Sequence, residues 1–266
     1  MGDFTPVPTT RLIATGGTAD DTLVVAGNLL YPADFDGEEG NDYLAGGVMG
    51  DNLLGGPGED VILGNNGDDT MDGGTGDDEL DGGSGDDLMM GGDGDDYMTG
   101  RSGNDVMHGG AGIDNMFGDV GNDVMFGDAG NDVMNGGGGN DAVLGGDDND
   151  RLFGGAGNDF VFGGNGADSL IGDAGSDALH GGTTDVDSDV AMLQYLMSHI
   201  EFATEVGWGS ANSFATRQTD LQAGIAFQGD SGAIDGLNGS TGEDLFVMNG
   251  EDTVFRVLAD DLRVDL

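Results

Sequence analysis

Cysteine is absent from this chain of 266 residues. Its absence excludes disulfide bonds, thiol catalysis and cysteine-based zinc sites. Lysine and arginine together number only 6, so the chain lacks the clustered cations that bind nucleic-acid phosphates. No apolar run approaches the roughly 18 residues that a membrane-spanning helix requires. We therefore expect no nucleic-acid partner and no membrane span.

Acidic residues and glycine are present in excess. Aspartate and glutamate number 52, the formal net charge is -46, and glycine contributes 57 residues. Such a composition is typical of disordered chains, because little apolar surface is available to offset the entropy of ordering them. An ordered structure therefore requires something that neutralises the carboxylates, and a hard divalent cation is the natural candidate.

A nine-residue frame, Gly-Gly-x-Gly-x-Asp-x-U-x with U a large aliphatic residue, recurs sixteen times without a gap from Gly37 to His180. Residues 154–162, with the sequence GGAGNDFVF, form one regular copy. Glycine at the first, second and fourth positions suits a tight turn that passes close to a metal. The frame predicts a six-residue loop ending in a carboxylate, followed by a three-residue strand with one inward side chain.

The sixth position is the candidate metal ligand, because it is aspartate in every repeat. These residues are Asp42, Asp51, Asp60, Asp69, Asp78, Asp87, Asp96, Asp105, Asp114, Asp123, Asp132, Asp141, Asp150, Asp159, Asp168 and Asp177. Asp244 holds the same position in a later copy at 239–247. Met49 and Asp148 replace the fourth glycine in two repeats, so sites that use Asp51 and Asp150 are expected to be less regular.

These repeats resemble those of the repeats-in-toxin (RTX) family of secreted calcium-binding proteins. The resemblance implies an all-β fold, a right-handed parallel β-roll in which two nonapeptides make one coil and each loop stacks on the loop two repeats later. It also implies that each calcium ion lies between stacked loops and takes both aspartates and several loop carbonyls. Eight loops on each of two edges then give about 14 calcium ions.

The eighth position is expected to point into a thin core, with one side chain per repeat. Burial of this column cannot by itself offset the entropy of so many glycines, so we expect calcium to be required for folding. Positions seven and nine point outward. In the even-numbered repeats they form an apolar stripe that includes Val124, Phe126, Leu144 and Phe160. A stripe of this size should be covered, or should mediate self-association.

Four segments are expected along the chain. Residues 1–36 form an N-terminal cap with a degenerate repeat at 16–24, out of phase because of an inserted loop near Tyr31. Residues 37–185 form the roll. Residues 186–228 form a small helical insertion, with an amphipathic helix from Asp187 to Val206 that packs on the stripe of the roll. Residues 229–266 close the roll and end in a candidate secretion segment.

The sequence contains no catalytic constellation, and we predict that the chain is not an enzyme. Residues 229–232, GDSG, match a short string around a serine nucleophile, but no plausible histidine partner accompanies them. His108 and His180 fall at outward ninth positions and are expected to be solvated.

The predicted function is that of a secreted or cell-surface calcium-binding roll with a structural or adhesive role, or a calcium-triggered folding module. Its partners would be calcium ions and a cell surface, a matrix or a second copy of the chain. An alternative is the C-terminal calcium-binding and secretion module of a larger extracellular enzyme, such as a protease, lipase or epimerase. An ice-binding roll fits less well, because threonine holds the third position in only one repeat, at Thr75. The N-terminus has no basic or apolar run of a cleavable signal, so the family's uncleaved C-terminal export signal is expected.

Overall fold

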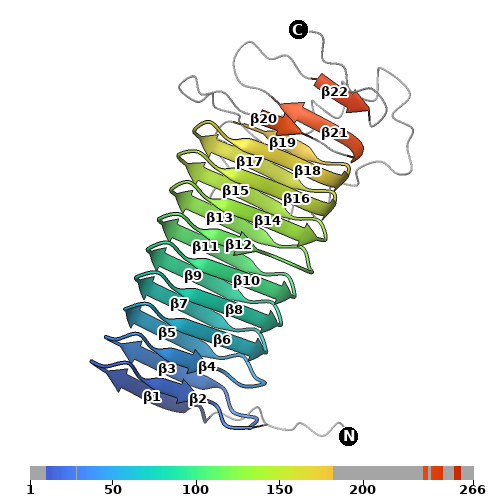
Figure 1. The fold of residues 1–266 in the computed structure, drawn as a ribbon. Coiled ribbons are helices and arrows are strands. Elements are labelled where there is room, and N and C mark those ends of the chain that lie inside the picture. The colour runs from blue at the N-terminus through green and yellow to red at the C-terminus, as the bar shows by residue number, and fades with distance from the viewer. Residues whose placement is uncertain (1–9, 28, 182–235, 239–240, 248–254, 259–266) are drawn as a thin grey trace, which may run out of the picture.

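The computed structural model describes residues 10–27, 29–181, 236–238, 241–247 and 255–258. Within these residues the regular structure is entirely β, with parallel strands stacked into one elongated solenoid (Figure 1). The described part of the chain contains no helix that could cross a membrane. The predicted helical insertion at 186–228 lies outside the described residues.

The strands form two faces, which alternate along the chain. Face A contains β1 (Leu12–Gly17), β3 (Ala33–Glu38), β5 (Asn52–Pro57), β7 (Thr70–Thr75), β9 (Leu88–Asp93), β11 (Val106–Ala111), β13 (Val124–Ala129), β15 (Ala142–Asp147), β17 (Phe160–Asn165) and β19 (Ala178–His180). Face B contains β2 (Thr22–Val24), β4 (Tyr43–Ala45), β6 (Val61–Asn66), β8 (Glu79–Ser84), β10 (Tyr97–Ser102), β12 (Asn115–Phe117), β14 (Val133–Gly138), β16 (Arg151–Gly157), β18 (Ser169–Gly175) and β20 (Gly236–Asn238).

Each strand from β1 to β19 pairs with the strand two elements later, in a register that follows the repeat. Met107 in β11 lies beside Met125 in β13, and Met98 in β10 lies beside Met116 in β12. Both pairs are separated by two nonapeptides, so equal positions of the frame stack along the axis. The predicted parallel β-solenoid with two repeats per coil is therefore confirmed. Its right-handed sense stays a prediction.

The prediction of three-residue strands was wrong for most repeats. Typical strands, such as β7 (Thr70–Thr75), contain six residues and run from the seventh position of one repeat to the third position of the next. The first three positions of the frame thus continue the parallel ladder, as in the pairs Gly56–Gly74 and Pro57–Thr75. The turn is confined to the fourth, fifth and sixth positions, so the glycines at positions one and two belong to the strand.

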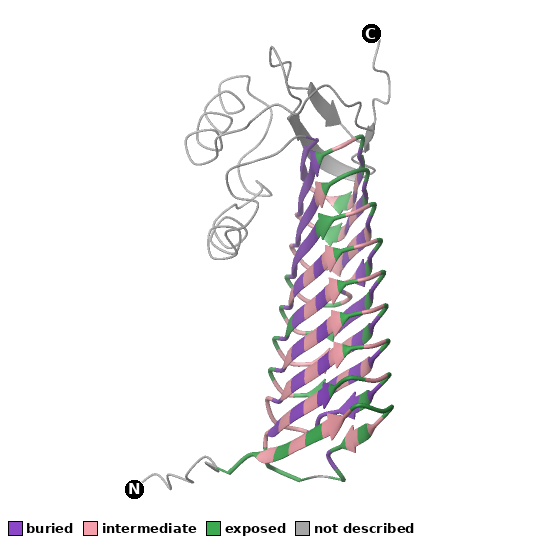
Figure 2. Cartoon of the chain, turned by 90° about the vertical axis from the view of Figure 1, so that its left-hand side faces the viewer, coloured by how far each residue is buried: buried purple, intermediate pink, exposed green. Residues whose placement is uncertain are grey.

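The eighth-position side chains form a continuous inward column, as predicted. All are fully buried: Leu44, Leu53, Ile62, Met71, Leu80, Met89, Met98, Met107, Met116, Met125, Met134, Val143, Leu152, Val161, Leu170 and Leu179. Phe35 and Val25 extend this core toward the N-terminal end. Figure 2 shows the resulting alternation of buried and accessible residues along each strand. Methionine therefore serves as core filler, with one layer per strand.

The outward positions of face A divide into two regions. On β9 and β11, Leu88 is 39% exposed and Val106 is partly accessible. On β13, β15, β17 and β19 the side chains at the seventh and ninth positions are all buried: Val124, Phe126, Ala142, Leu144, Phe160, Phe162, Ala178 and His180. The expectation that His180 is solvated was wrong, because it lies in this buried region at 1% exposure. His108 remains partly accessible, pairs with Asp128 and stacks on Phe126.

The N-terminal coil is stacked with a longer offset than the rest. Thr22 to Val24 of β2 pair with Tyr43 to Ala45 of β4, and Gly17 pairs with Glu38. These partners are three residues farther apart in sequence than partners within the array. The additional residues lie between β2 and β3, in the region that contains Tyr31, where the sequence predicts an inserted loop.

The stack also continues beyond the array. Leu170 in β18 pairs with Leu237 in β20, and Ala178 in β19 pairs with Leu245 in β21 (Thr241–Val247). β22 (Phe255–Leu258) then pairs with β21 in the antiparallel sense. The residues paired in β21 hold the same frame positions as their partners, so the later copy of the repeat keeps the register of the array.

Candidate metal centre

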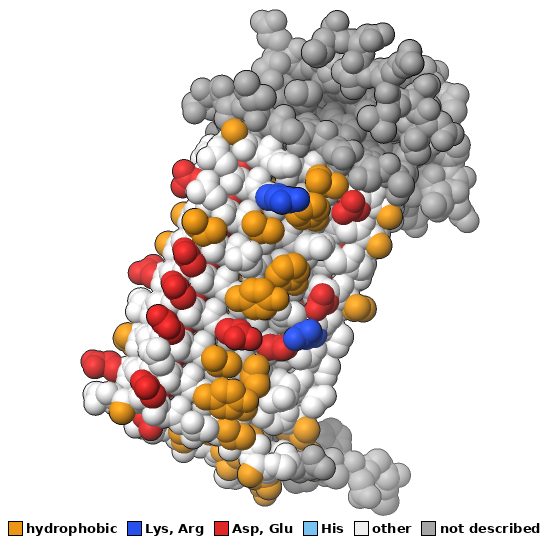
Figure 3. Space-filling model, viewed as in Figure 1, with side chains coloured by type: hydrophobic (Ala, Val, Ile, Leu, Met, Phe, Trp, Pro, Cys, Tyr) orange, Lys and Arg blue, Asp and Glu red, His pale blue; other side chains and the backbone are white. Residues whose placement is uncertain are grey.

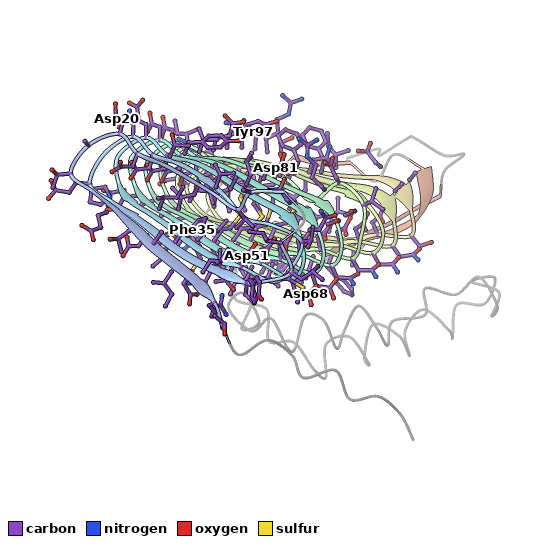
Figure 4. The ribbon with its side chains drawn as sticks, turned by 90° about the horizontal axis from the view of Figure 1, so that it is seen from below. Asp20, Phe35, Asp51, Asp68, Asp81 and Tyr97 are labelled. Atoms are coloured by element: carbon purple, nitrogen blue, oxygen red, sulfur yellow. The ribbon has the colours of Figure 1, made fainter. Side chains whose placement is uncertain are left out.

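The sixth-position aspartates line the two edges of the solenoid, where the turns lie. Asp42, Asp60, Asp78, Asp96, Asp114, Asp132, Asp150 and Asp168 lie on the first edge, and Asp51, Asp69, Asp87, Asp105, Asp123, Asp141, Asp159 and Asp177 on the second edge. In Figure 4, Asp20 and Asp68, from loops of the first and second edge, lie on opposite sides. All sixteen sixth-position aspartates are at most 3% exposed. Rows of buried carboxylates in an apolar, glycine-rich solenoid require compensation.

One hydrogen bond repeats in every gap between stacked loops of the array. The backbone N–H of each sixth-position aspartate donates to Oδ1 of the aspartate two repeats later, as from Asp42 to Asp60 at 2.7 Å and from Asp159 to Asp177 at 3.0 Å. Each carboxylate therefore reaches back toward the preceding coil. The structure brings together the aspartate pairs that the stacked-loop model requires.

The second oxygen, Oδ2, is buried without a hydrogen-bond donor among the described residues for most of these aspartates. This holds for Asp42, Asp60, Asp69, Asp78, Asp87, Asp96, Asp105, Asp114, Asp123, Asp132, Asp141, Asp150 and Asp159. A buried acceptor without a donor costs free energy, and a buried charged acceptor costs more. A cation between the loops would compensate these oxygens.

The first glycine of each repeat makes room for the carboxylate of the sixth-position aspartate in the same repeat. A Cβ at Gly154 would lie 2.7 Å from Oδ2 of Asp159 and 2.9 Å from the carbonyl oxygen of Gly172, in the next coil. Equivalent contacts recur at the first glycines along the array. A carboxylate oxygen and a carbonyl oxygen therefore converge above each first-position Cα, which explains why no other residue occupies this position.

Burial raises the pKa of the sixth-position carboxyl groups from Asp60 to Asp159. The pKa of Asp123 rises to about 8, mainly because burial disfavours its charged form. The hydrogen bond from the Asp105 backbone lowers this pKa, and the negative charges of Asp141 and Asp105 raise it further. The same cause raises the pKa of Asp150 and of Asp159 to about 8. Without a cation these groups hold protons near neutral pH, whereas a bound metal ion would favour the ionised form.

The donor set fits calcium. Each gap brings together the carboxylates of two stacked aspartates and a loop carbonyl, as at Asp42, Asp60 and Gly55. The described residues contain no group of three or more histidine, cysteine, aspartate or glutamate side chains arranged to hold a metal. Calcium accepts carbonyl oxygens alongside carboxylates, whereas softer metals prefer nitrogen or sulfur. The sixth-position aspartates would hold the ion, and the ion would neutralise them and join adjacent coils.

The two loops that lack the fourth glycine behave differently. Asp148 adopts a positive φ of 76°, and Oδ1 of Asp150 keeps its hydrogen bond with the Asp132 backbone at 2.9 Å. Met49 is not among the residues with positive φ, and Oδ2 of Asp51 accepts the N–H of Gly47 at 2.6 Å. Aspartate tolerates the left-handed region better than methionine. The loop of Asp150 therefore keeps the common geometry, and the loop of Asp51 does not.

A second ladder of side chains, which the sequence analysis missed, lies at the exposed fifth positions. The backbone N–H of Asn122 donates to Oδ1 of Asn104 at 2.9 Å, and that of Asn140 donates to Oδ1 of Asn122 at 2.7 Å. These bonds run opposite to those of the sixth-position aspartates. The recurrence of Asp or Asn at the fifth position was the available sequence signal.

Asp244 is placed only by its backbone. It lies in β21, and the pairing of Leu245 with Ala178 sets the residue before it next to Asp177 along the stack. Its role as a metal ligand stays a prediction.

The parallel β-solenoid and the row of buried, stacked carboxylates on each edge fit the class of calcium-binding repeat proteins. Comparison with family models matches the RTX calcium-binding nonapeptide repeat at residues 46–80, 72–107, 81–116, 108–143 and 144–179. These matches together cover half of the chain, which therefore belongs to the RTX calcium-binding nonapeptide repeat family. Comparison with curated proteins found no match.

Proposed function

We propose that this protein is a secreted or cell-surface roll that calcium folds and stiffens, with a structural or adhesive role and about 14 ions held between its stacked loops. The observation that carries the proposal is the set of buried Oδ2 atoms on each edge, from Asp42 to Asp159 with the exception of Asp51, that have no hydrogen-bond donor among the described residues. These atoms make the metal-free roll costly, and calcium removes that cost while joining consecutive coils. Export through an uncleaved C-terminal segment belongs to the same proposal.

The exposed surface supports a contact role rather than a catalytic one. Tyr97, 49% exposed, lies against Phe117 on face B, and Arg151 lies over the ring of Phe153. Figure 3 shows apolar side chains in a discontinuous band on this face, with acidic side chains in rows beside it. Exposed aromatic groups of this kind are typical of surfaces that bind a partner.

Calcium titration of the full chain tests the proposal. In chelator we expect an expanded chain, and in millimolar calcium a β-type circular dichroism spectrum with a smaller hydrodynamic radius. Magnesium should substitute poorly, because it requires a tighter octahedral site. A compact β spectrum that persists unchanged in excess chelator would contradict the proposal.

We further propose that residues 186–228 pack as a helical insertion on the buried region of face A. The burial of Val124, Phe126, Leu144 and Phe160 supports a cover over these outward positions. Deletion of residues 187–228 should leave calcium binding largely intact but expose this region to a hydrophobic dye or to a second copy. If the deleted chain stays monomeric and binds no dye, this segment is not the cover.

A further inference from the structure

The regular array and the family match do not define where the metal sites begin on each edge. We propose that the first edge has an additional calcium site between Asp21 and Asp42, and that the second edge lacks the site between Asp51 and Asp69. This inference rests on the proposed calcium binding and concerns which loops take part. Asp21 lies outside both the sixteen repeats and the matched residues 46–179.

The hydrogen bond that marks every gap of the array is also present between Asp21 and Asp42. The backbone N–H of Asp21 donates to Oδ1 of Asp42 at 2.7 Å, equal to the bond from Asp42 to Asp60. The fifth-position bond recurs as well, because the N–H of Asn41 donates to Oδ1 of Asp20 at 3.0 Å. Two independent ladders therefore extend into the N-terminal coil despite its longer sequence offset.

The oxygens around Gly16 repeat the arrangement of the other first-position glycines. A Cβ at Gly16 would lie 2.8 Å from Oδ2 of Asp21 and would also collide with the carbonyl oxygen of Gly37. Asp42 supplies the second carboxylate of this gap. It is 2% exposed, and its Oδ1 accepts the N–H of Asp21, while its Oδ2 lies beside Gly37, toward the next coil. The gap thus offers two carboxylates and a carbonyl, as in the array.

The loop at residues 46–51 keeps the bond from Asp51 to Asp69 and the two oxygens beside Gly46, but it differs from the other loops in the partner of Asp51 Oδ2. Oδ2 of Asp51 accepts the N–H of Gly47 at 2.6 Å, and its Oδ1 accepts the N–H of Ala33 at 2.6 Å. Both carboxylate oxygens are therefore satisfied by backbone donors, whose positive ends occupy the place of a cation. Ala33 also stands where the preceding coil would carry an aspartate. Asp51 therefore bonds the backbone of Ala33 and Gly47, near the inserted loop of the N-terminal coil, instead of binding metal.

Counting calcium on the full chain tests both parts. Bound calcium per chain would be measured after equilibrium dialysis, with circular dichroism in calcium as the check on folding. Asp21→Asn should lose one ion and Asp51→Asn none, whereas Asp87→Asn, inside the array, should lose two. Thr18→Ala, an exposed change in the same degenerate repeat as Asp21, should lose none.

Two further variants keep the test decisive. Gly16→Ala keeps Asp21 but fills the space beside its Oδ2, so it should also lose one ion. Met49→Gly permits the positive φ of the other loops and should add one ion. The inference is overturned if Asp21→Asn and Gly16→Ala bind as many ions as the unaltered chain, or if Asp51→Asn loses an ion. Failure of the unaltered chain to bind calcium would instead overturn the proposed function.

Discussion

The backbone N–H of Asp105 donates to Oδ1 of Asp123 at 2.8 Å, while Oδ1 of Asp105 accepts the N–H of Asp87 at the same distance. Each aspartate inside the array therefore belongs to two gaps at once. This sharing links neighbouring metal sites along an edge. It also makes the effect of a substitution depend on its place in the row.

Asp105→Asn is expected to remove two ions and to raise the calcium concentration at the folding midpoint several-fold, because both adjacent gaps lose a carboxylate charge. Isothermal titration with calcium and circular dichroism measure these effects. Asp86→Asn is the matched control, since it removes the same charge from the exposed fifth position of the stacked loop two repeats earlier and keeps its Oδ1 acceptor for the N–H of Asn104. Asp177→Asn, near the end of the row, should be milder. Equal losses in all three variants would contradict the stacked-loop model.

The stability of the metal-free chain should fall as pH rises. In the folded chain, burial raises the pKa of Asp69 to about 7 and that of Asp123 to about 8, from 3.8. The folded state therefore holds more protons than the unfolded state between pH 4 and 8, and folding loses stability through this window. Circular dichroism in excess chelator from pH 5 to pH 8 measures the effect, because any β structure that remains at pH 5 should be lost as pH rises.

Calcium affinity should show the opposite slope, because the ion must displace those protons. Titrations at the same two pH values provide the comparison. A metal-free chain that is more stable at pH 8 than at pH 5 would contradict the burial of these carboxyl groups.

Gly154→Ala should destabilise the calcium-loaded roll by about 1–3 kcal/mol, a typical cost of inserting a methyl group into filled space. Its Cβ would press on Oδ2 of Asp159 and the carbonyl of Gly172. Gly138→Ala is the control, because its Cβ would find only the Asp119 carbonyl oxygen, at 3.8 Å. The control should change stability by less than about 0.5 kcal/mol. Thermal unfolding in calcium distinguishes the two, and equal effects would show that the first glycine is not needed for space.

Folding should require less calcium in the C-terminal half of the array than in the N-terminal half. The fifth positions from repeat three to repeat seven are acidic: Glu59, Asp68, Asp77, Asp86 and Asp95. From Asn104 onward they are uncharged, and side-chain amides also bond across the gap, as between Asn140 and Asn158 at 3.2 Å. Like charges stacked between coils repel, whereas amides bond without a cation.

Hydrogen exchange followed along a calcium titration measures this gradient. Residues 104–176 should become protected at a lower calcium concentration than residues 59–95. Asn140→Asp should raise the requirement of the C-terminal half, and Asn66→Asp, an exposed third-position change, serves as a control for added charge. Simultaneous protection of both halves would contradict the expectation.

Most of the candidate site could be predicted from the repeat, but the geometry of the loops that depart from the repeat could not. The sixteen aspartates and the column of eighth-position side chains could be assigned because every repeat has nearly the same neighbours. Loops 16–21 and 46–51 both depart from the frame at the fourth position, with Ala19 and Met49. Both loops keep the bond to the next coil and an oxygen beside the first glycine, and only one contact distinguishes them: Oδ2 of Asp51 accepts the backbone N–H of Gly47.

The sequence by itself determined the all-β solenoid, its register and its inward column, because one constant period places equal residues above one another in every coil. Only the tertiary structure decided how far the strands extend, which oxygens lie without donors and which outward side chains are buried. Those properties depend on the coils before and after a residue. His108 and His180 hold the same frame position, yet one is partly accessible and the other is 1% exposed. Burial at such a position is set by what packs against the face, which the nine-residue period does not encode.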